Sequence, residues 1–296
     1  EHEGRIIQSR SEESVIKEIK RITQEEGFTG YISDLGGPTA NMYRMNCRDT
    51  KALHSCRRPS CIYPGICGHL ETDHQPLIQL YKKTRELQDV KKILIGSGVR
   101  YDLALRSLPY IRELATHHTG GYLKLAPEHI STSVLKIMRK PSFESYDEFV
   151  RQFNKFSKQA NKEQYIIPYF IAAHPGSSME DMIDALLWLK ERKLRLDQVQ
   201  TFLPTPMSEA TAVYYTGINS LSRSMDGVYV PRGLKERKIQ KAFLRYHDTA
   251  SWDLIREGLI KIHREDLIGK KGIVPAKIPN SYDQKRPFHR RHNNRK

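Results

Sequence analysis

The sequence lacks any apolar run that approaches the roughly 20 residues a membrane-spanning helix needs. Its first residues, Glu1 to Arg5, are polar and do not resemble the apolar part of a secretion signal. These absences predict a cytoplasmic protein with no membrane partner. No initiator Met is present, so we expect more chain before Glu1.

The motifs of several common enzyme classes are also missing. The sequence contains no G-x-S-x-G nucleophile elbow and no phosphate-binding P-loop. It also contains no paired-carboxylate motif for acid–base hydrolysis. An ordinary barrel enzyme of these classes is therefore not supported, and other patterns have to indicate the function.

Basic residues are abundant but unevenly placed. The formal net charge is +15, and the nine Lys and Arg residues between Lys270 and Lys296, with one Asp, supply +8 of it. Residues 284–296 contain one large apolar residue, Phe288, and no apolar periodicity. This composition predicts a disordered basic tail over 276–296. Such a tail either binds RNA or another polyanion by releasing counterions, or only keeps the protein in solution.

Helix signals and short apolar runs alternate along the first 203 residues. Ser11 is expected to cap a first helix, and later helices are expected to begin with capping boxes, Ser145 with Glu148 and Ser177 with Glu180. The apolar runs read as strands buried on both faces, as in a parallel sheet: 29–35, 93–95, 122–126, 166–172 and 199–203. This order predicts an α/β fold, either a barrel or a doubly wound sheet. In both architectures the functional residues lie at the carboxyl ends of the strands.

The pattern changes after Pro206. Residues 207–275 read mainly as helices, and we expect a C-terminal helical appendage that packs on the last strands. The expected organisation is a core over 1–206 with a cysteine-rich insertion at 44–75, the helical region 207–275, and the tail 276–296.

The four cysteines, Cys47, Cys56, Cys61 and Cys67, lie within one segment of 21 residues. Without a secretion signal, such clustering favours a metal or redox role over a disulfide framework. Zinc sites usually place cysteine pairs roughly two to four residues apart, and only Cys56 with Cys61 comes close, so an iron–sulfur cluster is favoured over zinc. The arginines after Cys56 favour a thiolate, which leaves a redox role open, and four reduced thiols in an ordered loop are also compatible. If the four bind one centre, their sulfurs should converge.

Several segments that follow the expected strands resemble the later part of a radical S-adenosylmethionine (SAM) core. They are EHISTSVLKIMRK at 128–140, FIAAHPGSSMED at 170–181 and QTFLPTP at 200–206. Three further segments resemble the YgiQ family of radical SAM proteins: GRIIQSRS at 4–11, DLGGPTANMY at 34–43 and NCRDTKALHSCRRPSCIYPGIC at 46–67. The resemblance runs from Glu1 to about Pro275. In that family a C-x3-C-x2-C loop that holds the catalytic cluster lies just before the position of Glu1, and no cysteine here has its spacing.

The resemblance implies a partial (β/α) barrel of the radical SAM type, without its first strand. It also implies that Gly36 and Gly37 lie at the amino group of SAM, where glycine permits close backbone approach. Glu128 would accept hydrogen bonds from the ribose hydroxyls. Arg139 or Lys140 would pair with the SAM carboxylate, although an exposed helix end accounts for these cations equally well.

The same resemblance places His174 and Gly176 at the cofactor. His174 stands where the motif usually has Gly or Phe, and of its two interpretations we favour a packed histidine over a polar contact to adenine or substrate. The cysteine segment would overhang the mouth of the barrel.

The implied enzyme uses a [4Fe-4S] cluster to cleave SAM to a 5′-deoxyadenosyl radical, which abstracts hydrogen from an unidentified substrate. The resemblance also implies a partner that donates electrons, such as flavodoxin or ferredoxin. Because the cluster cysteines are not in this sequence, we expect the chain alone to be inactive. The alternative is a zinc-containing nucleic-acid-binding protein, with the cysteine segment as a zinc module and the basic tail as a phosphate anchor.

Overall fold

The computed structural model describes residues 7–35, 39–219, 222 and 224–276, without the side chains of Ala52 and His54. Its helices are α1 Glu12–Ile22, α2 Thr50–Ser55, α3 Gln75–Arg85, α4 Tyr101–Ala104, α5 Leu108–Glu113, η1 Leu114–His118, α6 Thr132–Met138, α7 Phe143–Gln159, α8 Met179–Glu191, α9 Glu209–Thr216, α10 Leu234–Leu244, η2 Thr249–Ser251, α11 Trp252–Lys261 and η3 Glu265–Leu267. Its strands are β1 Tyr31–Ser33, β2 Lys92–Leu94, β3 Tyr122–Glu128, β4 Tyr165–Ala172 and β5 Gln200–Thr201. None of the helices in these ranges combines the length and the apolarity that crossing a membrane requires.

The strands occupy the five places that the apolar runs predict, and every described pair is parallel. β1 pairs with β2, while β4 lies between β3 and β5 in a second sheet. Just after β2, the Ile95 N–H donates to the carbonyl of His118 in η1, the helix that precedes β3, 2.9 Å away. The architecture is therefore α/β with parallel sheets, as expected, and the described strands do not close into a barrel.

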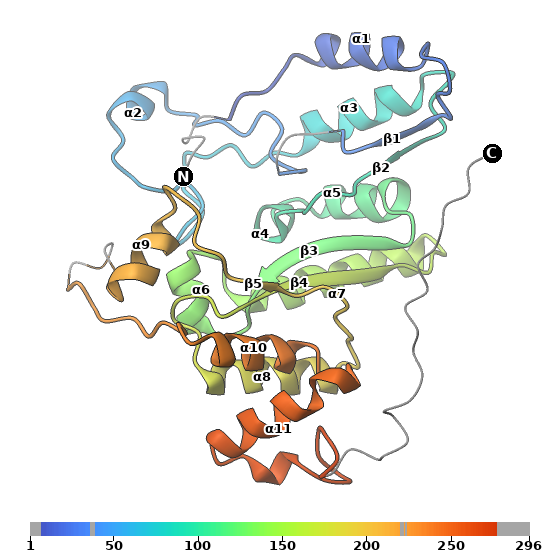
Figure 1. Cartoon of the computed structure of the whole chain (residues 1–296). Coiled ribbons are helices and arrows are strands. Elements are labelled where there is room, and N and C mark those ends of the chain that lie inside the picture. The colour runs from blue at the N-terminus through green and yellow to red at the C-terminus, as the bar shows by residue number, and fades with distance from the viewer. Residues whose placement is uncertain (1–6, 36–38, 220–221, 223, 277–296) are drawn as a thin grey trace.

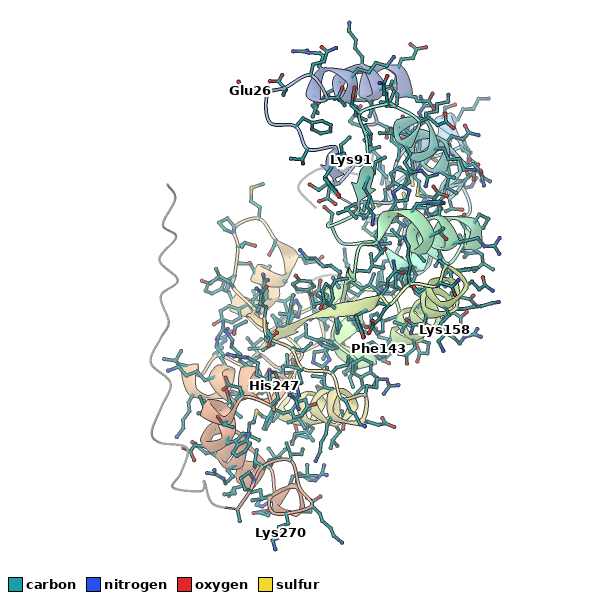
Figure 2. All side chains as sticks on the ribbon, turned by 90° about the vertical axis from the view of Figure 1, so that its right-hand side faces the viewer. Glu26, Lys91, Phe143, Lys158, His247 and Lys270 are labelled. Atoms are coloured by element: carbon teal, nitrogen blue, oxygen red, sulfur yellow. The ribbon has the colours of Figure 1, made fainter. Side chains whose placement is uncertain are left out.

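The strands lie in the middle of the molecule between α3 and α8, with α1 at one end and α11 at the other (Figure 1). Figure 2 shows an open arc that runs from Glu26 to Lys270, with Lys158 of α7 on its outer side. One apolar cluster joins α3, α5 and α7 to β2 and β3, and a second joins β4 and α8 to α10 and α11. The helices of the C-terminal region thus share a core with the end of the sheet.

The prediction that the strands are buried on both faces is wrong for β3, and Tyr31 of β1 and Tyr165 of β4 are exposed as well. Leu123 and Leu125 are fully buried, whereas Tyr122 and Lys124 are exposed. Among the described residues, helices cover one face of this strand, so its side chains alternate as in a half-buried strand. The sequence Tyr-Leu-Lys-Leu already carries this alternation.

The helix starts expected from the sequence are correct in one case. The hydroxyl of Ser11 caps α1, as predicted. The capping box at Ser145 is wrong because that residue lies inside α7. The capping box at Ser177 is wrong by one position, since Ser178 and Asp181 form the box that begins α8.

Candidate functional site

Glu128 ends β3 in a partly enclosed position. Its backbone is left-handed, with φ 67°, where a register shift interrupts the pairing of β3 with β4. The side chain is 16% exposed, and its Oε1 lies 3.2 Å from the Nζ of Lys140. Burial raises the pKa of the Glu128 carboxyl, and Lys140 opposes this effect. A carboxylate in this position can accept hydrogen bonds from the hydroxyls of a ligand at the strand end.

An unpaired hydroxyl lies near this carboxylate. Tyr101, at the start of α4, is buried, and its Oη has no hydrogen-bond partner in the described part of the chain. Burial raises the pKa of Tyr101, and the carboxylates of Asp102 and Glu128 contribute in the same direction. This hydroxyl has almost no accessible surface, so a ligand could contact it only if the side chains around it moved.

The two cations expected near the SAM carboxylate already have carboxylate partners. Lys140 pairs with Glu128, as described above. Arg139 ends α6 in a left-handed conformation with φ 53°, and its guanidinium contacts the Glu209 carboxylate of α9 at 3.1 and 3.3 Å. A ligand carboxylate at this position would have to compete with Glu209 for Arg139.

The loop between β4 and α8 carries His174 and Gly176. The His174 ring is 5% exposed and lies edge-on to Phe202, with 5.0 Å between ring centroids. Its Nδ1 donates to the Pro175 carbonyl at 2.8 Å, which places a proton on that nitrogen. Burial lowers the pKa of His174 to about 4, so the ring is neutral near pH 7. This geometry agrees with the packed histidine, and a contact to a cofactor stays a prediction.

Gly176 is needed for the path of the backbone. Its φ is 90°, its N–H donates to the Tyr229 carbonyl at 2.7 Å, and an added Cβ would lie 3.2 Å from Cγ1 of Ile137. A side chain here would therefore be strained and crowded whether or not a ligand binds.

The expected amino-group site, Gly36 and Gly37, lies outside the described residues. Just before it, Asp34 ties the ends of β1 and β2 together: its Oδ1 accepts from the N–H groups of Gly96 and Ser97 at 2.8 and 2.6 Å. Sequence reasoning assigned Asp34 no role, although an Asp directly after a strand is a recognisable signal.

The cysteine segment folds back on itself at its base. The N–H groups of Arg48 and Glu71 donate to the carbonyls of His69 and Asn46, at 2.7 and 2.8 Å, and the Arg48 and Glu71 side chains form a bidentate ion pair. Further along, the Tyr63 hydroxyl donates to the carbonyl of Lys136 in α6, 3.3 Å away. The segment thus reaches the helix that ends at Arg139, beside the carboxyl ends of the strands.

The four cysteines are partly buried and form no disulfide: Cys47, Cys56, Cys61 and Cys67. The Cys47 thiol donates to the Asp49 carbonyl at 3.4 Å, and the N–H of Cys67 donates to the Cys61 carbonyl at 2.8 Å. Across residues 7–276, apart from the undescribed positions, no three His, Cys, Asp or Glu side chains gather so that they could hold a metal ion. The expected convergence of the four sulfurs is therefore not found in the described structure. Metal binding by this loop stays a prediction, and it would require the loop to rearrange.

Glu128 fits one part of a SAM molecule. Its carboxylate can accept hydrogen bonds from the two ribose hydroxyls of a nucleoside. The described residues offer no set of thiolates for a [4Fe-4S] cluster, so no chemical step through a cluster follows from them.

Comparison with known proteins gives the following similarities. Residues 197–296 match a family model described as a domain of unknown function, DUF3362. A UPF0313 protein of Shewanella oneidensis is 59% identical over 91% of the chain, which covers 35% of that protein. The UPF0313 protein YgiQ of Escherichia coli K12 is 55% identical over 93% of the chain, covering 38% of that protein, and UPF0313 protein PA4928 of Pseudomonas aeruginosa is 54% identical over 95%, also covering 38%. The chain spans less than half the length of the curated relatives it matches.

Proposed function

Because the chain belongs to the UPF0313 family, which includes YgiQ, we propose that it is part of a radical SAM enzyme whose cofactor site lies at the carboxyl ends of β3 and β4. The names of the relatives state the family and no activity. Support for radical SAM chemistry therefore comes from the motif resemblance at 128–140 and 170–181, and from the position of both motifs at the carboxyl ends of β3 and β4. The cluster ligands would belong to a part of the protein outside this sequence.

The observation that carries the proposal is the position of Glu128. This carboxylate leaves a parallel strand at its carboxyl end, where ligands bind in α/β proteins. It is largely shielded from water and pairs with Lys140. A pair of ribose hydroxyls would add two hydrogen bonds to this carboxylate.

When bound, SAM supplies the chemistry of hydrogen abstraction by a carbon radical. The residues of this chain bind and orient the nucleoside. Glu128 accepts from its hydroxyls, Lys140 keeps that carboxyl charged against the effect of burial, and the loop with His174 and Gly176 borders the site on the next strand. No substrate is assigned, because no described residues identify one.

The proposal is tested by titrating SAM into the chain and into Glu128→Gln by calorimetry. The Gln side chain keeps the size of Glu128 and removes its charge. We expect the substitution to weaken binding about tenfold or more, since hydrogen bonds to charged groups contribute about 1.5–3 kcal/mol. Glu148→Gln is the matched control, because Glu148 is a carboxylate on the outer surface of α7, paired with Arg151.

Equal affinity for wild type and Glu128→Gln would contradict the assignment of Glu128. Absence of saturable SAM binding, both in this chain and in a full-length UPF0313 relative purified without oxygen and supplied with iron and sulfide, would refute the proposed function as a whole.

A further inference from the structure

Gln240 of α10 is fully buried, and its whole side-chain amide contacts the loop that follows β4. Its Oε1 accepts from the Ala173 N–H at 2.9 Å and from the Ser177 hydroxyl at 3.3 Å. Its Nε2 donates to the Ser177 carbonyl at 2.9 Å. One side chain, more than 60 residues away in sequence, thus holds both ends of the loop 173–177.

The same loop is connected to the end of β3 through His129. The Ser131 N–H donates to His129 Nδ1 at 3.0 Å, which leaves the ring proton on Nε2. That Nε2 lies 3.3 Å from the Ser177 hydroxyl and 3.3 Å from the thioether of Met182. The Ser177 hydroxyl can accept from His129 and donate to Gln240. Every contact in the series from Ser131 through His129 and Ser177 to Gln240 therefore pairs one donor with one acceptor. Burial lowers the pKa of His129 to about 4, which keeps the ring in this neutral form.

The loop adopts a backbone that has to be held in place. Ala173 has φ 59° and Gly176 has φ 90°. The left-handed region is unfavourable for a residue with a Cβ, so Ala173 adopts it only because surrounding contacts enforce it. The contacts on both residues come from the C-terminal region: Gln240 accepts from the Ala173 N–H, and Tyr229 accepts from the Gly176 N–H.

We propose that Gln240 is a positioning residue of the candidate site, which sets the conformation of the loop 173–177 and joins it through Ser177 and His129 to the loop after β3. The inference rests on the proposed function only for the identity of the ligand, SAM. Gln240 acts through Ala173 and Ser177, which flank the two residues expected at the cofactor. It belongs to the part of the chain that matches DUF3362, so this segment would shape the site of the core and not form a separate module.

The chain contains a matched control for this proposal, Gln164. That residue is 8% exposed and makes the same number of side-chain hydrogen bonds: it accepts from the Ser157 hydroxyl at 2.7 Å and donates to the carbonyls of Ala115 and Thr119 at 3.0 and 2.8 Å. It precedes β4, at the amino end of the strand, opposite the candidate site. Gln164→Leu removes an equivalent buried network without touching the loop 173–177.

The test compares Gln240→Leu with Gln164→Leu in the full chain. Hydrogen exchange of the Ala173 amide, measured by NMR, should become at least about fivefold faster in Gln240→Leu. This factor corresponds to the loss of one hydrogen bond that contributes about 1 kcal/mol. In Gln164→Leu that amide should exchange as in the wild type. Affinity for SAM should fall in Gln240→Leu and not in Gln164→Leu, although both variants lose stability.

A second variant covers the case in which Gln240→Leu does not fold. Gln240→Glu has nearly the same shape, and a protonated carboxyl reproduces all three contacts. Burial favours that form, and His129, which contacts the loop, and His174, which lies within it, are neutral at pH 5.5 because burial lowers the pKa of each to about 4. We expect wild-type exchange of the Ala173 amide near pH 5.5, and faster exchange than in the wild type at higher pH as the carboxyl ionises.

The outcomes separate the two proposals. If the Ala173 amide exchanges equally in both Leu variants, or the Glu variant never shows wild-type protection, the positioning role is overturned. If exchange changes as expected while no form of the protein binds SAM, the positioning role holds and the proposed function fails.

Discussion

Three buried imidazoles predict that the fold loses stability on mild acidification. Burial lowers the pKa of His74, His129 and His174 to about 4, whereas an imidazole in the unfolded chain titrates near 6.5. Between these values the three imidazoles bind protons in the unfolded chain and not in the folded protein, and His117, whose pKa burial also lowers, acts in the same direction. Stability is therefore fully present above about pH 6.5 and falls as the pH is lowered towards 4.

The magnitude follows from the same values. A difference of one pKa unit between folded and unfolded states corresponds to about 1.4 kcal/mol. Acidification to about pH 4 therefore lowers the free energy of unfolding by on the order of 3 kcal/mol for each imidazole, and by on the order of 10 kcal/mol for the three together. Glu128 acts in the opposite direction, because its raised pKa stabilises the fold in acid. Since domains are typically stable by about 5–15 kcal/mol, we expect unfolding before the pH reaches about 4.

The assay is urea denaturation followed by circular dichroism at several pH values between about 7 and about 4.5. His129→Gln should reduce the pH dependence by about one proton, because it removes one of the three groups. The control is His263→Gln, at an exposed position after α11. A free energy of unfolding that stays constant between pH 7 and 5, or a pH dependence that His129→Gln leaves unchanged, would refute the reasoning.

Two further predictions concern the segments with unusual composition. When the chain is purified without oxygen, it should contain iron, or failing that zinc, at about one metal centre per chain. Cys61→Ser should remove the metal while the circular dichroism of the strands is retained. A metal-free wild type would contradict this prediction. The second prediction concerns residues 280–296, which lie outside the described structure and whose composition predicts disorder. Deleting them should change the melting temperature by no more than about two degrees and flatten the salt dependence of any RNA binding. A larger fall in melting temperature would show that the tail stabilises the fold.

The parts of the fold that the sequence predicts correctly depend on local patterns. Each strand overlaps a short run that the sequence marks as apolar, and Ser11 caps α1 within its own first turn, so neighbouring residues alone specify these elements. The half-buried character of β3 is also local, because Tyr122 and Lys124 alternate with Leu123 and Leu125 in the sequence itself; which helices cover the apolar face is a property of the assembled layers.

Ser177 shows why the candidate site was harder to predict. A serine three residues before a glutamate is a regular sequence signal for a capping box, and the same signal at Ser178 with Asp181 is the one the helix uses. The Ser177 hydroxyl instead lies between His129 and Gln240, which are 48 and 63 residues away. Neither partner stands out in the sequence: a lone His after a strand and a lone Gln inside a helix are both common.

The helical region that follows Pro206 reaches the loop 173–177 through a continuous series of contacts. Gly258 of α11 allows this helix to lie against α10, because an added Cβ would lie 2.4 Å from Cγ2 of Ile239 and 2.7 Å from Cζ of Phe243. Phe243 is fully buried in the cluster that α10 and α11 share with β4 and α8. The position of α10 is therefore fixed by packing on both sides, and Gln240 projects from this helix onto Ala173. A larger residue at position 258 would have to displace α10, and with it the side chain that holds both ends of the loop.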